Sequence, residues 1–222
     1  MKPKILLSWS SGKDSAWTLY VLRQSRQWDI AGLVTTVNTA FGRVSMHGVR
    51  EQLLERQAQA AALPLWKVPI PYPCPNEVYE SAMRELITRA KGAGITHFAF
   101  GDLFLQDVRD YRERQLAGTG ITPVFPLWGI NTTELAYDMI ASGLRATITC
   151  VDPRQIPASL IGREFDEALL KDLPPSADPC GENGEYHTFC HAGPMFAQPI
   201  PVRTGEVVER DGFVYVDILP VT

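Results

Sequence analysis

The feature that most restricts the fold of this chain is a regular alternation of short apolar runs and helical patterns over its first two-thirds. This order predicts strands joined by helical crossovers. Because such crossovers are right-handed, the strands should lie parallel, with helices on both faces. We therefore predict an α/β fold with a parallel five-stranded sheet. The predicted strands cover 5–7, 30–37, 65–70, 97–100 and 124–127, and the predicted helices cover 14–23, 47–62, 77–90 and 107–117.

The alternation ends near Trp128, and the remainder predicts a smaller α+β region. Its last two strands meet at Asp211-Gly212, a dipeptide that favours a hairpin turn. We expect one domain over 1–128 and a second over 129–222, and the open hairpin edge could pair across a homodimer. The other predicted elements are helices at 132–142 and 165–173, a strand at 145–151 and a loop at 174–187.

Composition narrows the classes of protein that are compatible with this pattern. Hydrophobic residues make up 45% and charged residues 21%, which is typical of an ordered globular chain. The net charge of -4 argues against a nucleic-acid-binding face. No apolar run reaches the roughly 20 residues of a membrane span, and the first run breaks at Ser8, so neither a span nor a signal peptide is predicted. We expect a cytoplasmic protein.

The segment that joins the first predicted strand to the first predicted helix is suited to phosphate binding. Its small residues allow a ligand to approach the backbone closely, and the following helix offers the positive end of its dipole. It is not a Walker A loop, because Leu7 stands where that motif requires glycine. The alternative is a serine-rich turn that caps a helix. The predicted phosphate contacts are Ser10, Ser11, Gly12, Lys13, Asp14 and Ser15.

A second unusual segment, 181–188, places Glu182, Glu185 and His187 close together between glycines that permit tight turns. Such a loop can coordinate a cation, bind an amine or perform acid–base chemistry. The alternative is a solvated acidic loop before a strand.

The first loop resembles the SGGKDS signature of the PP-loop ATP pyrophosphatases, a family that includes GMP synthetase, asparagine synthetase, argininosuccinate synthetase and tRNA-thiolating enzymes. The resemblance implies cleavage of ATP between the α and β phosphates, with the loop holding the departing pyrophosphate. Ser11 replaces the first glycine of the signature. If this position requires a positive φ, serine would be strained there.

The two loops together resemble the diphthine–ammonia ligase family, and the chain is identified as a member, with features of bacterial members. The family also shows Met-His, Gly-Asp and Pro-Leu-Trp motifs, here at 46–47, 101–102 and 126–128. The resemblance implies an adenine nucleotide alpha-hydrolase-like (HUP) fold, an ATP-binding domain over 1–128 and a substrate-binding domain over 129–222. It further implies that ATP, with Mg²⁺, adenylates a carboxylate and that ammonia then displaces AMP. The carboxylate, on a small molecule or a protein, is left open.

The resemblance and the strand order suggest roles for residues of the first region. Lys13 is assigned to the β and γ phosphates. Asp14 is assigned to Mg²⁺ or to capping the first helix. Thr35, at the end of the second strand, is expected beside the adenine. Asp102 is expected to orient ammonia or a metal, with capping of the next helix as the alternative.

Further candidates are assigned to the substrate. Arg109 and Arg112 share a helical face and are expected to contact a phosphate or a carboxylate; the alternative is a solvated face paired with Asp110 or Glu113. His47 is expected to touch the substrate or to cap its helix.

The loop residues Glu182, Glu185 and His187 are expected to bind the amine or the substrate carboxylate, because an ammonium ion needs acceptors and a base. Two rival functions are a tRNA-modifying PP-loop enzyme and an adenine-nucleotide-binding module without catalysis. The acidic chain disfavours the first, and Ser11 is the support for the second.

Overall fold

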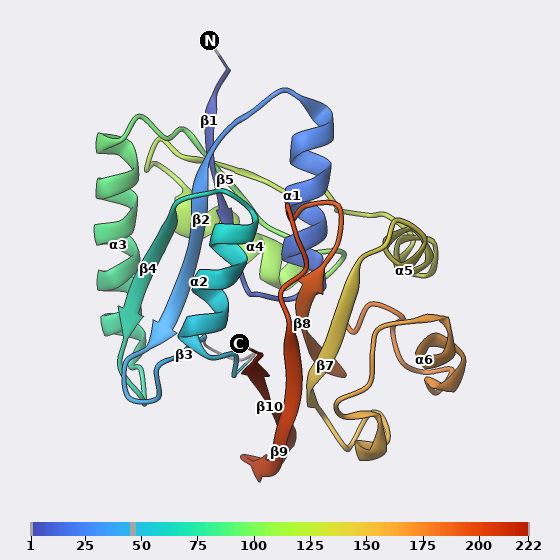
Figure 1. Cartoon of the computed structure of the whole chain (residues 1–222). Coiled ribbons are helices and arrows are strands. Elements are labelled where there is room, and N and C mark those ends of the chain that lie inside the picture. Colours follow the sequence, from blue (N-terminus) through green and yellow to red (C-terminus); the bar gives the residue numbers. More distant parts are fainter. Residues whose placement is uncertain (1, 45–47, 222) are drawn as a thin grey trace.

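The computed structural model describes residues 2–44 and 48–221, so the predicted Met46-His47 motif lies outside the described residues. The chain forms two sheets that lie side by side, with helix α1 between them (Figure 1). The first is largely parallel and the second is antiparallel.

The first sheet has five parallel strands in the order β4-β2-β1-β5-β6, so the mixed α/β architecture with a largely parallel sheet is confirmed. A short sixth strand, β3, was not predicted and pairs antiparallel with the end of β2. The strands are β1 Lys4–Ser8, β2 Asp29–Asn38, β3 Arg43–Val44, β4 Leu65–Ile70, β5 His97–Ala99 and β6 Thr122–Val124.

Helices cover both faces of this sheet. In β1, Ile5 and Leu7 face one hydrophobic cluster and Leu6 faces the other, as the two-residue period of a strand requires. The first cluster includes apolar residues of α1 and α2, and the second includes those of α3 and α4. These helices are α1 Lys13–Ser25, α2 Glu51–Ala60, α3 Asn76–Gly92 and α4 Gln106–Leu116.

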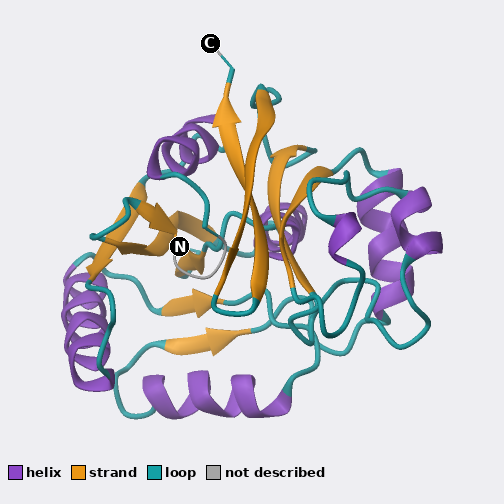
Figure 2. Ribbon diagram, turned by 90° about the horizontal axis from the view of Figure 1, so that it is seen from below, coloured by secondary structure: helices purple, strands orange, loops and turns teal. Residues whose placement is uncertain are grey.

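The second sheet has the order β8-β7-β10-β9 and is antiparallel throughout (Figure 2). Asp211 and Gly212 join β9 to β10 with φ of 53° and 81°, as the predicted hairpin turn requires. Helix α5 begins after Asn131, whose side chain accepts hydrogen bonds from the backbone of Thr133 and Glu134. The elements are α5 Thr132–Ala141, β7 Arg145–Val151, η1 Ala158–Leu160, α6 Glu167–Asp172, β8 Tyr186–Ala192, β9 Val202–Arg210 and β10 Phe213–Pro220.

The two sheets share one buried cluster that runs from Ile5 to Ile218. The predicted boundary at 128 falls in the turn between β6 and α5. The antiparallel sheet packs on the α1 face of the parallel sheet, and this packing brings β8 against the loop before α1.

Three predicted boundaries were wrong. The last parallel strand is 122–124 rather than 124–127, because an edge strand tolerates Pro123. Helix α2 begins at Glu51 rather than at 47, because Gly48 has a φ of 65° and Arg50 is extended. Strand β8 begins at Tyr186, inside the predicted loop.

Within the described ranges, no helix is long and apolar enough to cross a membrane.

Candidate functional site

The loop between β1 and α1 lies at the carboxyl end of the parallel sheet, the edge where ligands bind in folds of this kind. Ser11 has a φ of 72° and is fully buried. The backbone at this position therefore has the positive φ at which serine is strained. Such a conformation costs a non-glycine residue on the order of 1–3 kcal/mol, so surrounding contacts must hold it.

Serine hydroxyls occupy the inside of this loop. The Oγ of Ser10 accepts a hydrogen bond from the backbone N–H of Gly12 at 3.3 Å, and the Oγ of Ser15 accepts one from the N–H of Ser10 at 3.4 Å. Both bonds are long compared with the usual 2.9–3.0 Å. The first turn of α1 follows directly and presents its positive dipole end. Backbone donors held only by weak hydroxyl contacts are suited to phosphate oxygens.

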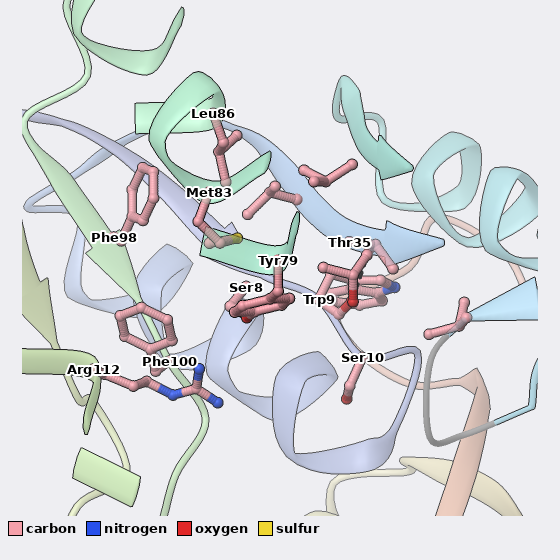
Figure 3. Close-up of a pocket in the computed structure, with 14 residues that line it drawn as sticks. Ser8, Trp9, Ser10, Thr35, Tyr79, Met83, Leu86, Phe98, Phe100 and Arg112 are labelled. Atoms are coloured by element: carbon pink, nitrogen blue, oxygen red, sulfur yellow. Dashed lines mark hydrogen bonds between the residues drawn. The ribbon is translucent and has the colours of Figure 1, made fainter. Parts of the chain in front are cut away.

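A cavity of about 180 Å³ adjoins the loop (Figure 3). Its walls come from strand ends, α3 and Arg112 of α4 and combine apolar and polar side chains, while Ser8 and Ser10 border it on the side of the loop. Thr35 lies in its wall, but its hydroxyl donates to the Trp9 carbonyl at 2.7 Å. The sequence did not predict most residues of this wall. The one feature that could have indicated them was the presence of apolar residues at the strand ends. The missed residues include Trp9, Val68, Tyr79, Met83, Leu86, Phe98 and Phe100.

An ion pair closes one side of the cavity. The Asp102 carboxylate accepts hydrogen bonds from Arg112 at 2.7 and 3.3 Å, and the Arg112 guanidinium lies 4.5 Å from the centre of the Phe100 ring. Asp102 does not cap α4, whose N-cap residue is Leu105. Glycine before Asp102 allows close packing on α1, because a Cβ on Gly101 would lie 3.1–3.2 Å from backbone atoms of that helix.

Arg109 does not join Arg112 at the cavity. Its Nε donates to Glu113 at 2.8 Å, and its guanidinium lies 4.9 and 4.8 Å from the Phe125 and Trp128 rings. This arrangement fits the alternative interpretation of a paired helical face. His47 lies outside the described residues.

The Lys13 side chain is buried and turned toward the second loop. Its Nζ donates to both carboxylate oxygens of Asp14 at 2.9 Å and to the Cys180 carbonyl. The rings of Phe165 and Tyr186 lie 5.5 and 5.4 Å away. Burial lowers the pKa of Lys13, but the Asp14 carboxylate more than offsets it, so the pKa is raised. The loop predicted to bind an amine therefore contacts the amine of Lys13.

The second loop is held mainly by its own carboxylates. Glu185 is buried, and its Oε1 accepts hydrogen bonds from Asp178 N at 2.7 Å and Asn183 Nδ2 at 3.0 Å. Asp178 in turn accepts from the backbone of Glu182 at 2.9 Å. At Gly181, with φ of 71°, a Cβ would lie 2.9 Å from the Tyr186 ring. The geometry gives Glu185 a scaffolding contact that the sequence did not predict.

Glu182 and His187 differ in environment from Glu185. Glu182 accepts a hydrogen bond from the backbone N–H of Leu103 at 2.7 Å, beside Asp102. Burial, together with the nearby carboxylates of Asp14 and Asp102, raises the pKa of Glu182 to about 7. Burial lowers the pKa of His187 to about 4. Burial therefore favours the neutral form of both side chains.

Over residues 2–44 and 48–221, no three His, Cys, Asp or Glu side chains form a group that could hold a metal ion. Asp14 is the carboxylate closest to the phosphate loop by sequence. Both of its oxygens accept hydrogen bonds from Lys13 Nζ at 2.9 Å, so a Mg²⁺ ion held by Asp14 would take most of its ligands from substrate phosphates and water.

The fold and the site together define an α/β protein with a largely parallel sheet and a serine-rich loop at its strand ends, directly before α1. Residues 131–218 match the family model described as diphthamide synthase C-terminal domain. Diphthine–ammonia ligase of Bos taurus is 26% identical over 175 residues, or 72% of this chain. Diphthine–ammonia ligase of Homo sapiens is 34% identical over 93 residues, or 40% of this chain. The chain is thus similar to diphthine–ammonia ligases, and its C-terminal part matches a diphthamide synthase domain.

The aligned residues span 66% of the bovine protein and 35% of the human one.

Proposed function

We propose that this chain is an ATP-dependent ligase that adenylates a carboxylate, with release of pyrophosphate, and transfers ammonia to it to form an amide. The observation that carries the proposal is the juxtaposition of the phosphate loop, with its buried Ser11 at positive φ, and a cavity with both polar and apolar walls at the same strand ends. The similarity to diphthine–ammonia ligases supports the same reaction.

In this proposal the cavity takes the adenine and the loop takes the phosphates. Val34 and Phe98 offer apolar faces for a planar base, and Ser10 borders the cavity where the phosphate chain would begin. Arg112, with Asp102 and Phe100 holding its guanidinium, supplies a cation at this edge. Lys13 reaches the phosphates by leaving its contacts with the second loop.

The proposed reaction has two steps. A carboxylate oxygen of the substrate attacks the α-phosphorus, the bond from that phosphorus to the bridging oxygen breaks, and pyrophosphate leaves with the electron pair. Ammonia then attacks the acyl carbon, and AMP leaves as the carbon–oxygen bond breaks. Glu182 accepts the proton that the nitrogen loses. Preorganised donors for the leaving pyrophosphate are the main catalytic requirement.

Mg²⁺, held by Asp14 together with the phosphates, would supply charge neutralisation of the leaving group. The carboxylate belongs to a small molecule or a protein, and free ammonia is the nitrogen source. The acidic chain disfavours a nucleic-acid substrate.

The test is incubation of the protein with ATP, Mg²⁺ and ammonium, with and without candidate carboxylates, and separation of the nucleotide products. We expect AMP and pyrophosphate in equal amounts when an accepted carboxylate is present. Release of ADP and phosphate instead would contradict cleavage between the α and β phosphates.

A nucleotide-binding module without catalysis is the second candidate, because Ser11 departs from the glycine of the signature. Binding of ATP without AMP formation, under any carboxylate tested, would favour it.

A further inference from the structure

Gln57 is a polar residue on the buried face of α2, where its neighbours Leu53, Leu54 and Ala58 are apolar. Its side chain is fully buried. A buried amide without hydrogen-bond partners costs on the order of 1–3 kcal/mol, so a glutamine at such a position needs a reason.

The reason lies in three hydrogen bonds, each of which ends on the phosphate loop or on β8. Gln57 Oε1 accepts from the indole Nε1 of Trp9 at 2.9 Å. Gln57 Nε2 donates to the Ser11 carbonyl at 3.0 Å and to the Cys190 carbonyl at 2.7 Å. The Gln57 side chain thus links Trp9 and Ser11, the two residues that flank Ser10, to Cys190 of β8.

The bond to the Ser11 carbonyl acts on the strained residue itself. That carbonyl accepts a second hydrogen bond, from the Cys190 N–H at 2.9 Å. In a planar trans peptide the carbonyl and the following N–H point in opposite directions. Fixing the Ser11 carbonyl toward α2 and β8 therefore turns the Gly12 N–H the other way, toward Ser10, which borders the cavity.

We infer that Gln57 is a positioning residue of the phosphate loop, which holds Ser11 at positive φ and aims the Gly12 N–H at the phosphates. It touches no substrate and acts through Ser11. The inference deepens the proposed function and rests on it for the nucleotide measurement, although the loop conformation itself can be measured without nucleotide.

The test is a double-mutant cycle with Gln57→Met and Ser11→Gly, using the non-cleavable analogue α,β-methylene ATP with Mg²⁺ in titration calorimetry. Glycine adopts a positive φ without strain, so it should remove the need for Gln57. A strain on the order of 1–3 kcal/mol corresponds to a factor between about 5 and about 150 in Kd. We expect Gln57→Met to weaken binding about tenfold and Ser11→Gly alone to change it less than about twofold. The double variant should recover most of the loss.

Gln59→Met is the matched control, because Gln59 is exposed on the same helix; its Kd should equal that of the wild type. Thermal unfolding of every variant reports general damage. Unchanged binding by a folded Gln57→Met variant would overturn the inference. So would a double variant no better than Gln57→Met, because a merely structural role predicts no rescue.

If Gln57→Met does not fold, Gln57→Glu replaces it. Glutamate keeps the acceptor for Trp9 but places a carboxylate oxygen against the carbonyls of Ser11 and Cys190. Gln57→Glu should therefore weaken binding, and Ser11→Gly should again restore the affinity. If the wild type does not bind the analogue, the proposed function fails. The inference is then decided by hydrogen exchange of the Gly12 amide, which Gln57→Met should accelerate and Ser11→Gly should slow again in that background. Exchange unaffected by Gln57→Met would refute it.

Discussion

The loop before α1 and the loop before β8 are both glycine-containing and charged, yet they use their polar groups differently. In the first loop, Ser10 and Ser15 make long hydrogen bonds beside a cavity, which leaves backbone donors available to a ligand. In the second, Asp178 and Glu185 bind the loop's own backbone and side chains. Similar residue types therefore border a cavity in the first loop and form a self-supporting scaffold in the second.

The difference shows why residue type alone does not assign a role. Glu182 and Glu185 are close in sequence, but Glu182 faces Leu103 and the carboxylates of the first region, whereas Glu185 faces inward. Substitutions in the two loops and at the cavity should separate the roles of these residues.

Replacement of Lys13 by alanine should abolish binding of α,β-methylene ATP, because the loop loses the cation assigned to the phosphates. The loss should exceed about a hundredfold in Kd, or roughly 2.7 kcal/mol. Lys67→Ala is the control, since Lys67 pairs with Glu51 and Glu55. Wild-type affinity in a folded Lys13→Ala variant would remove Lys13 from the site.

Replacement of Glu185 by alanine should destabilise the fold by about 2–4 kcal/mol, because the Asp178 N–H and the Asn183 amide lose a charged acceptor. Urea unfolding measures the loss, and the affinity for α,β-methylene ATP should stay within about twofold of the wild type if the scaffold role is separate. A large loss of nucleotide affinity at unchanged stability would assign Glu185 to the nucleotide site.

Replacement of Arg112 by alanine should weaken analogue binding about tenfold, because the cavity loses a cation and Asp102 loses its partner. Arg109→Ala should change the same Kd less than about twofold, since an exposed pair such as Arg109 with Glu113 contributes little. Equal effects of the two changes would show that the helical face acts as a unit.

The pH dependence of stability should carry a small signal from Glu182. Its pKa rises from 4.5 to about 7 on folding. Between pH 4.5 and about 7, the native state therefore keeps a proton that the unfolded chain has released. Stability from this group is present below pH 4.5 and is lost as pH rises through about 7. Glu182→Gln should flatten that slope in urea unfolding; an unchanged slope would contradict the raised pKa.

The same titration bears on the proposed chemistry. If Glu182 takes the proton from the nitrogen, amide formation should increase as pH rises through about 7, and Glu182→Gln should remove this increase.

The sequence by itself determined the local parts. The strand–helix alternation predicted the largely parallel sheet, and Asp211-Gly212 predicted the hairpin. These features depend on periodicity and backbone preference, which neighbouring residues set.

The tertiary structure alone decided which side chains meet. Packing of β8 against the phosphate loop paired Lys13 with the Cys180 carbonyl and brought Gln57 to Ser11. It also separated Arg112 from Arg109, although their spacing puts both on one helical face. Such contacts join residues far apart in the chain, and their energy depends on burial and on exact partners, neither of which local sequence spacing specifies.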